Sequence, residues 1–284
     1  MLLSESLLDQ LAESVLAQQR IHRRQRLNTI VSIGGGSCTG KSSQVAAGLM
    51  TRLGEQTLLL AQDRYQRNPE YLKNMHPLYR GDHPNNYGIS TCGKVLSQLK
   101  RGQSVTVPNY AFRPDQPIGS KIIHPRPIII FEGLYAGHDN LREYCDLFVY
   151  VEAPYYARLL RRILRNTCER YRKEPALVLR GFLSSVTAAH QDFVVKQKSS
   201  TNLIIQTGFN ISDAIQRFNL TPLPHHYELS PKFTFDIDAA TTITITRRDE
   251  ILMFLLLYQN QPYLIFAIDE ELANQLEMSD MWAY

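Results

Sequence analysis

The sequence of 284 residues has few cysteines, and they form no paired metal-binding pattern. The four thiols are far apart, and no two of them make a Cys-x-x-Cys motif. A disulfide-dependent scaffold and a zinc site built from paired cysteines are therefore excluded. We expect free thiols, in the reducing environment of a cytoplasm, at Cys38, Cys92, Cys145 and Cys168.

Long hydrophobic runs are also missing. The longest one, Ile251 to Tyr258, has eight residues, whereas a membrane-spanning helix needs about 18 or more. The first residues, Met1 to Glu5, contain an acid and no basic segment, so we expect no signal peptide. The sequence thus predicts a protein without a membrane partner.

The excess of one charge sign is small, because 31 Lys and Arg against 27 Asp and Glu give a net charge of +4. This value does not indicate a nucleic-acid partner. The composition, 44% hydrophobic and 20% charged, is that of a globular chain and excludes disorder, collagen and coiled-coil arrays as the main architecture.

Apolar, strand-like runs alternate with helical patterns over the first two thirds of the chain, which predicts an α/β fold with a parallel sheet and flanking helices. Residues 66–93 are rich in Pro, Asn, Gly and Tyr and are expected to form a functional loop region. We expect strands at 29–33, 57–61, 127–131, 147–151 and 203–206, and helices at 4–26, 41–53, 94–101, 154–171 and 184–198.

The pattern changes near Phe209, where short strands with tight turns replace the α/β alternation. We expect strands at 233–237, 242–246, 251–258 and 262–268 and a helix at 269–278, which together form a small β-rich appendage. The predicted domains are an N-terminal helical extension (1–27), a main α/β domain (28–208) and a β-rich C-terminal domain (209–284).

A glycine-rich segment after the first predicted strand fits the pattern Gly-x-x-x-x-Gly-Lys-Ser of a phosphate-binding loop. Its backbone N–H groups and the start of the next helix would face phosphate oxygens. Lys41 would reach the β- and γ-phosphates, and the Ser42 hydroxyl would bind Mg²⁺. The sequence has no Asn-Lys-x-Asp segment, which disfavours a GTPase. The expected nucleotide-binding residues here are Gly35, Gly36, Ser37, Cys38, Thr39, Gly40, Lys41, Ser42 and Ser43.

Two acids follow predicted strands, at the sheet edge where α/β proteins bind ligands. Asp63 comes directly after the second strand, and Glu132 ends the third. A carboxylate at Asp63 can accept the proton of an attacking hydroxyl, and Glu132 can hold Mg²⁺ directly or through water. Either acid alone could simply cap a helix or face solvent.

An arginine-rich helix forms the next candidate feature. At 100° per residue, Arg158, Arg162 and Arg165 share one face, and Arg170 and Arg172 follow. Beside a phosphate loop these arginines favour a lid over the phosphates of a nucleotide. A nucleic-acid surface and a solvated basic face are the alternatives.

Six segments in this order resemble the uridine kinase and phosphoribulokinase family of P-loop kinases, and the uridine kinase branch most of all. The resemblance runs from about Ile30 to Thr207 and implies a P-loop fold. Its segments are Gly-Gly-Ser-Cys-Thr-Gly-Lys-Ser (35–42), Gln-Asp-Arg-Tyr (62–65), Asp-His-Pro-Asn-Asn-Tyr (82–87), Pro-Asn-Tyr-Ala-Phe (108–112), Ile-Phe-Glu-Gly-Leu (130–134) and Arg-Arg-Ile-Leu-Arg-Asn-Thr-Cys-Glu-Arg-Tyr-Arg (161–172).

The resemblance implies roles for matching residues. Asp63 with Lys41 would be catalytic, Glu132 would lie beside the metal with Ser42, and Asp82 would hold ribose hydroxyls. Lid arginines on the donor phosphates would be Arg165, Arg170 and Arg172. The resemblance would place Asp82, Tyr110, Phe112 and Arg162 against the acceptor. We also expect acceptor contacts at Tyr65 and Asp115.

The sequence departs from the family where the base is read, because Tyr110-Ala111-Phe112 is followed by Arg113-Pro114-Asp115. An ionised Asp115 only accepts hydrogen bonds, so it suits the amino group of cytosine or adenine. Arg180, downstream of the lid, would suit an anionic acceptor. We therefore expect a cytoplasmic, Mg²⁺-dependent kinase that transfers the γ-phosphate of ATP or GTP to a uridine- or cytidine-like nucleoside. A kinase for a sugar phosphate or another metabolite, and a non-catalytic nucleotide-binding regulator, are the alternatives, and a homo-oligomer stays open.

Overall fold

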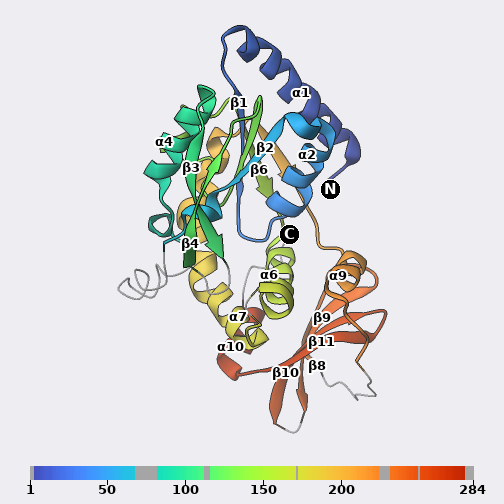
Figure 1. Cartoon of the computed structure of the whole chain (residues 1–284). Coiled ribbons are helices and arrows are strands. Elements are labelled where there is room, and N and C mark those ends of the chain that lie inside the picture. Colours follow the sequence, from blue (N-terminus) through green and yellow to red (C-terminus); the bar gives the residue numbers. More distant parts are fainter. Residues whose placement is uncertain are drawn as a thin grey trace. The chain divides into compact units, whose positions relative to one another are not determined.

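The computed structural model (Figure 1) describes residues 3–67, 82–111, 116–170, 172–223, 231–248 and 250–278. The chain forms two compact units, one of residues 1–153 with 184–208 and the other of residues 154–183 with 209–284. A compact unit need not coincide with a domain of the sequence. The domain boundaries expected near residues 27 and 208 therefore stay predictions.

The first unit contains a five-stranded parallel sheet with the strand order β2-β5-β1-β6-β7. Its central strands are buried on both faces, because alternate residues enter two separate apolar clusters: Val31 and Ile33 lie in one, and Ile30 lies in the other. The strands are β1 (Thr29–Gly35), β2 (Thr57–Ala61), β5 (Ile128–Glu132), β6 (Leu147–Glu152) and β7 (Leu203–Gln206).

Helices cover the two faces of this sheet (Figure 1). On one face, α1 (Glu5–Arg24) packs with the helix that follows β1, which begins as η1 (Lys41–Ala46) and continues as α2 (Ala47–Leu53). On the other face lies α4 (Ile89–Lys100), and the clusters join each helix to the strands beneath it. The short helix α5 (Asp139–Arg142) and the helical run of α8 (Thr187–Ala189), η8 (His190–Val194) and η9 (Val195–Ser200) complete this unit.

Two features of the first unit differ from the expectation. The helix expected at 94–101 begins at Ile89, inside the stretch expected to be loop, because the buried side chains of Cys92, Val95 and Leu96 extend its apolar face. A two-stranded antiparallel ribbon, β3 (Val105–Ala111) with β4 (Gln116–Ile123), was not expected.

The second unit combines helices with a four-stranded antiparallel sheet of order β11-β10-β9-β8. The four predicted strands and the last helix are confirmed, and α7 and α9 are additional. The strands are β8 (Pro231–Asp236), β9 (Thr241–Arg248), β10 (Ile251–Tyr258) and β11 (Gln261–Ile268). The helices are α6 (Tyr155–Leu164) with its continuation η6 (Arg165–Arg170), α7 (Pro175–Gly181), α9 (Ile211–Phe218) and α10 (Glu270–Glu277). The helical segment η7 (Phe182–Val186) begins in this unit and ends in the first one.

The predicted fold class is confirmed: a parallel sheet with flanking helices, and a separate antiparallel sheet near the C-terminus. Within the described ranges, no helix combines the length and the apolar character needed to cross a membrane.

Candidate active site

The loops that carry the predicted chemistry leave the sheet side by side. Glu132 at the end of β5 pairs in register with Ile33 of β1 and with Ala61 of β2. The phosphate loop after β1, Asp63 after β2 and Glu132 therefore meet at the carboxyl edge of the sheet, which is where parallel α/β sheets bind ligands.

The turn from β1 into the phosphate loop requires a glycine. Gly35 has a φ of +132°, and a Cβ there would lie 2.2 Å from the carbonyl oxygen of Val151 on the neighbouring strand β6. Cys38 in the loop also has a positive φ, of 63°, which residues with a side chain rarely adopt. Glycines at two bends permit the conformation of the loop, whereas Cys38 adopts it with some strain.

Lys41 folds back over this loop. Its Nζ donates hydrogen bonds to the carbonyl oxygens of Gly35, at 2.9 Å, and Gly36, at 2.6 Å. The Thr39 hydroxyl also donates to the Gly36 carbonyl, at 3.0 Å. An ammonium group has three N–H donors, so one donor of Lys41 remains for a ligand oxygen.

A threonine that the sequence did not single out fixes the loop from the far side. Thr207, directly after β7, donates from Oγ1 to the carbonyl oxygen of Thr39 at 2.6 Å, and its backbone N–H donates to the backbone carbonyl oxygen of Glu152 at 2.8 Å. Its position just after a strand of the parallel sheet, as for Asp63, was the only sequence signal for this residue.

Ser42 and Glu132 form the candidate metal site. The Ser42 hydroxyl donates to Glu132 Oε2 at 2.9 Å, which places two oxygen ligands side by side next to Lys41. Among the described residues no three His, Cys, Asp or Glu side chains form a metal cluster. Two protein oxygens fit Mg²⁺, which keeps several waters and is completed by phosphate oxygens.

Burial and the nearby acids act on Lys41 in opposite directions. Burial lowers its pKa, and the negative charges that oppose this shift are, in order, Glu132, Asp63, Cys38 and Asp82. Three carboxylates that lie far apart in the sequence therefore act on one ammonium group. A buried ammonium group is suited to bind phosphoryl oxygens, and acids beside it are suited to the metal ion that accompanies them.

The segment with Asp63 forms a short helical turn, η3 (Gln62–Tyr65). Asp63 is half-buried at the sheet edge, whereas Tyr65 is 6% exposed and packs in the apolar cluster with α4 and β3. Burial raises the pKa of the Tyr65 hydroxyl. The structure gives Tyr65 a packing role, and its contact with an acceptor stays a prediction.

Asp82 is buried at the start of a compact turn, η5 (Pro84–Asn86). His83 caps this turn, since its Nδ1 accepts the Asn85 N–H at 3.1 Å. Burial lowers the pKa of His83, and its ring lies edge-on to Phe193 at 4.6 Å. Tyr110 is half-buried on β3, and Phe112 and Asp115 lie outside the described residues.

The arginines lie in the second unit. Arg162 is half-buried on α6, and Arg165 donates from Nε to Asn166 Oδ1 at 3.2 Å. Arg170 ends η6, and Arg172 follows with a positive φ. Their roles as acceptor and lid residues stay predictions.

The charge of Arg180 is already paired within its own unit. It donates to Glu271 at 3.1 Å and forms an ion pair with Asp269, both at the start of α10. These bonds do not support Arg180 as the residue that receives an anionic acceptor.

The sequence matches the model of the phosphoribulokinase/uridine kinase family over residues 30–212, well over half of the chain. The chain belongs to this family. It is therefore a phosphotransferase with an alcohol group as acceptor, as the sequence predicted, and the residues at the carboxyl edge are its candidate active site.

Relatives support this assignment. A uridine kinase from Macrococcus caseolyticus is 33% identical over 190 residues, which cover 66% of this chain and 92% of the relative. A uridine kinase from Staphylococcus aureus is 33% identical over 189 residues, which cover 64% of this chain and 89% of the relative.

Solved structures show that this kinase shares its fold with proteins named for different activities. A possible uridine kinase from Bacillus stearothermophilus has a TM-score of 0.52 at 16% identity, covering 72% of this chain and 97% of that one. D-glycerate 3-kinase from Cryptococcus neoformans has a TM-score of 0.53 at 15% identity, covering 72% and 96%. The fold alone therefore does not select the acceptor.

Proposed function

We propose that this kinase transfers the γ-phosphate of ATP or GTP, with Mg²⁺, to a hydroxyl of a nucleoside of the uridine or cytidine type. The observation that carries the proposal is the meeting of the phosphate loop, Asp63 and Glu132 at the carboxyl edge of the sheet, where the Ser42 hydroxyl bonds to Glu132. The relatives named uridine kinase, at 33% identity, favour a nucleoside over other acceptors.

The donor side of the site would be the phosphate loop. Backbone N–H groups of residues 35–43 and the Lys41 ammonium would bind the phosphates, and Ser42 with Glu132 would hold Mg²⁺. The bound ion would neutralise charge on the β- and γ-phosphates. Arg165, Arg170 and Arg172 would add charge over the same phosphates.

On the acceptor side, Asp63 would act as the general base. Its carboxylate would take the proton of the acceptor hydroxyl as that oxygen bonds to the γ-phosphorus, and the bond from the γ-phosphorus to the bridging oxygen would break to release the nucleoside diphosphate. Asp82 would hold the ribose hydroxyls. The acceptor would also contact Tyr65, Tyr110, Phe112, Asp115 and Arg162.

A sugar phosphate is the second candidate acceptor, because the stretch with Asp115 departs from the family pattern. The pairing of Arg180 with Asp269 and Glu271 removes one argument for this candidate. We expect small-molecule partners, no nucleic acid or membrane, and a cytoplasmic location; whether the chain forms a homo-oligomer stays open.

The test is transfer of labelled γ-phosphate from ATP or GTP, with Mg²⁺, to uridine, cytidine, adenosine, ribulose 5-phosphate and ribose 5-phosphate. Lys41→Ala is the blank. We expect turnover of a pyrimidine nucleoside, with cytidine preferred if Asp115 reads an amino group. Turnover of the sugar phosphates alone would establish the second candidate. Nucleotide binding without transfer to any acceptor would indicate a regulator.

A further inference from the structure

The loop that follows Glu132 is held by two buried glutamines, one earlier and one later in the sequence than the loop itself. Gln62 accepts the backbone N–H of Tyr135 at 2.8 Å. Gln197 accepts the N–H of Gly137 at 3.0 Å and donates to the carbonyl oxygen of Leu134, also at 3.0 Å. The backbone of this loop is therefore fixed on both sides.

Close packing at the start of the loop also restricts the position of its backbone. A Cβ at Gly133 would lie 2.3 Å from the Cβ of Gln62, so only glycine allows Gln62 to reach the loop. Gln62 is fully buried and directly precedes Asp63. The position of Tyr135 is thus tied to the segment that carries the proposed base.

Tyr135 uses this fixed backbone to reach Asp82. Its ring is 1% exposed and packs in an apolar cluster with Tyr87, at a centroid distance of 5.6 Å, and Phe148. Its hydroxyl donates a hydrogen bond to the backbone carbonyl oxygen of Asp82. The bond joins residues 53 positions apart and links the sheet edge to the turn that begins at Asp82.

The turn after Asp82 is itself tied to the segment of the proposed base. The Arg67 N–H donates to the Asn86 carbonyl at 2.8 Å, and the Gly88 N–H donates to the Tyr65 carbonyl at 2.9 Å. The Arg67 side chain adds a bond from Nε to the Asn85 carbonyl at 2.9 Å. The Tyr135 hydroxyl adds a further link, at the residue whose carboxylate would bind the acceptor.

We infer that Tyr135 is a positioning residue that holds the backbone of Asp82, and with it the Asp82 carboxylate, in place for the acceptor. The inference rests on the proposed function, in which Asp82 binds acceptor hydroxyls. A misplaced carboxylate weakens binding of the acceptor, whereas the phosphate loop is bound by other residues and keeps its geometry.

Tyr135→Phe tests the inference, because it removes the hydroxyl and keeps the ring. We expect the KM for the nucleoside to rise roughly 5- to 20-fold, and the KM for ATP to change less than about 2-fold. Tyr144→Phe is the control: it removes a phenol hydroxyl at the opposite end of the sheet and should leave both values unchanged. Equal effects of Tyr135→Phe on the two KM values would overturn the inference.

Combination with Asp82→Ala separates action through Asp82 from a direct effect. If Tyr135 acts through Asp82, the double variant should have the KM for the nucleoside of Asp82→Ala alone. Additive effects would mean that Tyr135 acts independently, and the inference would be wrong. If Asp82→Ala itself leaves this KM unchanged, the proposed role of Asp82 fails, and so does this inference.

Amide hydrogen exchange gives a readout that does not need turnover. Tyr135→Phe should speed exchange at residues 83–88 and leave that of residues 29–35 unchanged. Unchanged exchange at 83–88 would show that the hydroxyl does not hold the turn. Faster exchange in a protein that phosphorylates no nucleoside would confirm the structural link and locate the failure in the proposed function.

Discussion

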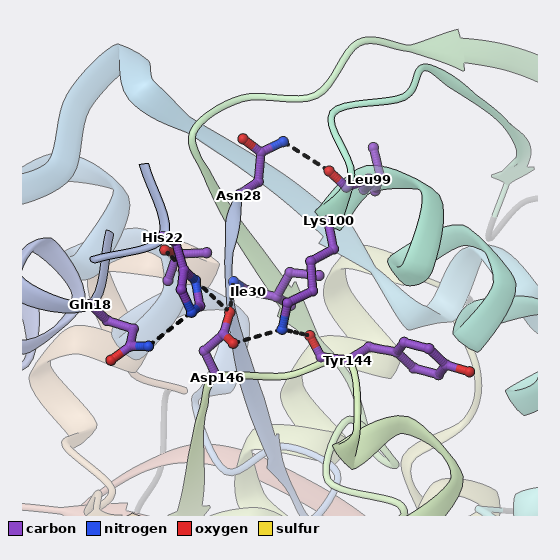
Figure 2. Close-up of polar contacts among 9 residues, drawn as sticks. Gln18, His22, Asn28, Ile30, Leu99, Lys100, Tyr144 and Asp146 are labelled. Carbon is purple, nitrogen blue, oxygen red and sulfur yellow. Dashed lines mark hydrogen bonds and ion pairs between the residues drawn. The ribbon is translucent and has the colours of Figure 1, made fainter. Parts of the chain in front are cut away.

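The two edges of the parallel sheet use buried charge in different ways. At the amino edge, Asp146 accepts the Ile30 N–H at 2.8 Å, forms an ion pair with Lys100 at 2.7 Å and lies 3.4 Å from Nδ1 of His22 (Figure 2). At the carboxyl edge, the Lys41 ammonium bonds to carbonyl oxygens, and the acids whose charges act on it come from separate segments of the chain.

The amino-edge cluster joins four elements of the first unit. His22 comes from α1, Lys100 ends α4, Ile30 is in β1, and Asp146 precedes β6. Lys100 also donates to the Tyr144 carbonyl at 3.1 Å, and Gln18 contacts His22 at 3.0 Å (Figure 2). The comparison teaches that buried charges paired with one another stabilise the fold, whereas charges arranged around one cation suit a ligand.

The largest expected effect is on catalysis at the carboxyl edge. Asp63→Asn keeps the size of the side chain and removes the base, so kcat for the acceptor should fall about 10²- to 10⁴-fold. Thermal unfolding should be little changed. Near-full turnover in this variant would exclude Asp63 as the base.

The matching change at the amino edge should affect stability instead. Asp146→Ala removes the carboxylate partner of half-buried Lys100 and the acceptor of the Ile30 N–H, so it should lower the free energy of unfolding by about 2–4 kcal/mol. Urea denaturation measures this loss, and Asp139→Ala, at an exposed acid, is the control. KM values at a temperature where the variant is folded should stay near those of the parent. A loss of stability no larger than that of the control would break the comparison.

A smaller effect on stability is expected from Lys41→Met, a change that should also abolish transfer because it removes the ammonium group proposed to bind the phosphates. Burial lowers the pKa of Lys41 below 10.5, so between the lowered value and 10.5 the unfolded chain binds more protons, and stability rises with pH. Removing the amine should raise Tm at neutral pH, by an amount that shrinks as the pH rises through this window. Tm measured from pH 7 to 10 tests this expectation, and a lower Tm at pH 7 would contradict it.

The smallest expected effect is a difference in reactivity among the cysteine thiols. Burial raises the pKa of Cys92 to about 12 and that of Cys145 to about 11. At pH 8 the thiolate fractions are then about 10⁻⁴ and 10⁻³, and iodoacetamide should leave both residues unmodified. Half-exposed Cys38 in the phosphate loop should react, and ATP should protect it. Mass spectrometry of the digested protein identifies the labelled cysteines. Labelling of Cys92 before Cys38 would contradict the prediction.

The parts of the fold that the sequence predicted correctly have strong local signals. The β-branched run at 29–33 and the apolar run at 251–258 form strands, as their residue types and lengths favour. The ribbon of β3 and β4 was missed because Pro108 interrupts the first strand and the second has a weak apolar pattern.

The site shows the same division. The phosphate loop and the strand-end acids could be found from sequence, because spacing along the chain defines them. Thr207 and Tyr135 could not, because they act through contacts with residues 168 and 53 positions away. Such contacts form only when folding brings distant segments together at the edge of the sheet, so no local sequence pattern predicts them.

The N-terminal helix has a consequence for how this protein should be handled in the laboratory. Leu8, Leu11 and Val15 of α1 share an apolar cluster with β1 and α2, although the family match begins only at residue 30. A shortened chain that starts at residue 28 would keep the whole segment that matches the family model, but it would expose that cluster to water. Aggregation during purification, rather than a change in specificity, is the outcome to expect from such trimming.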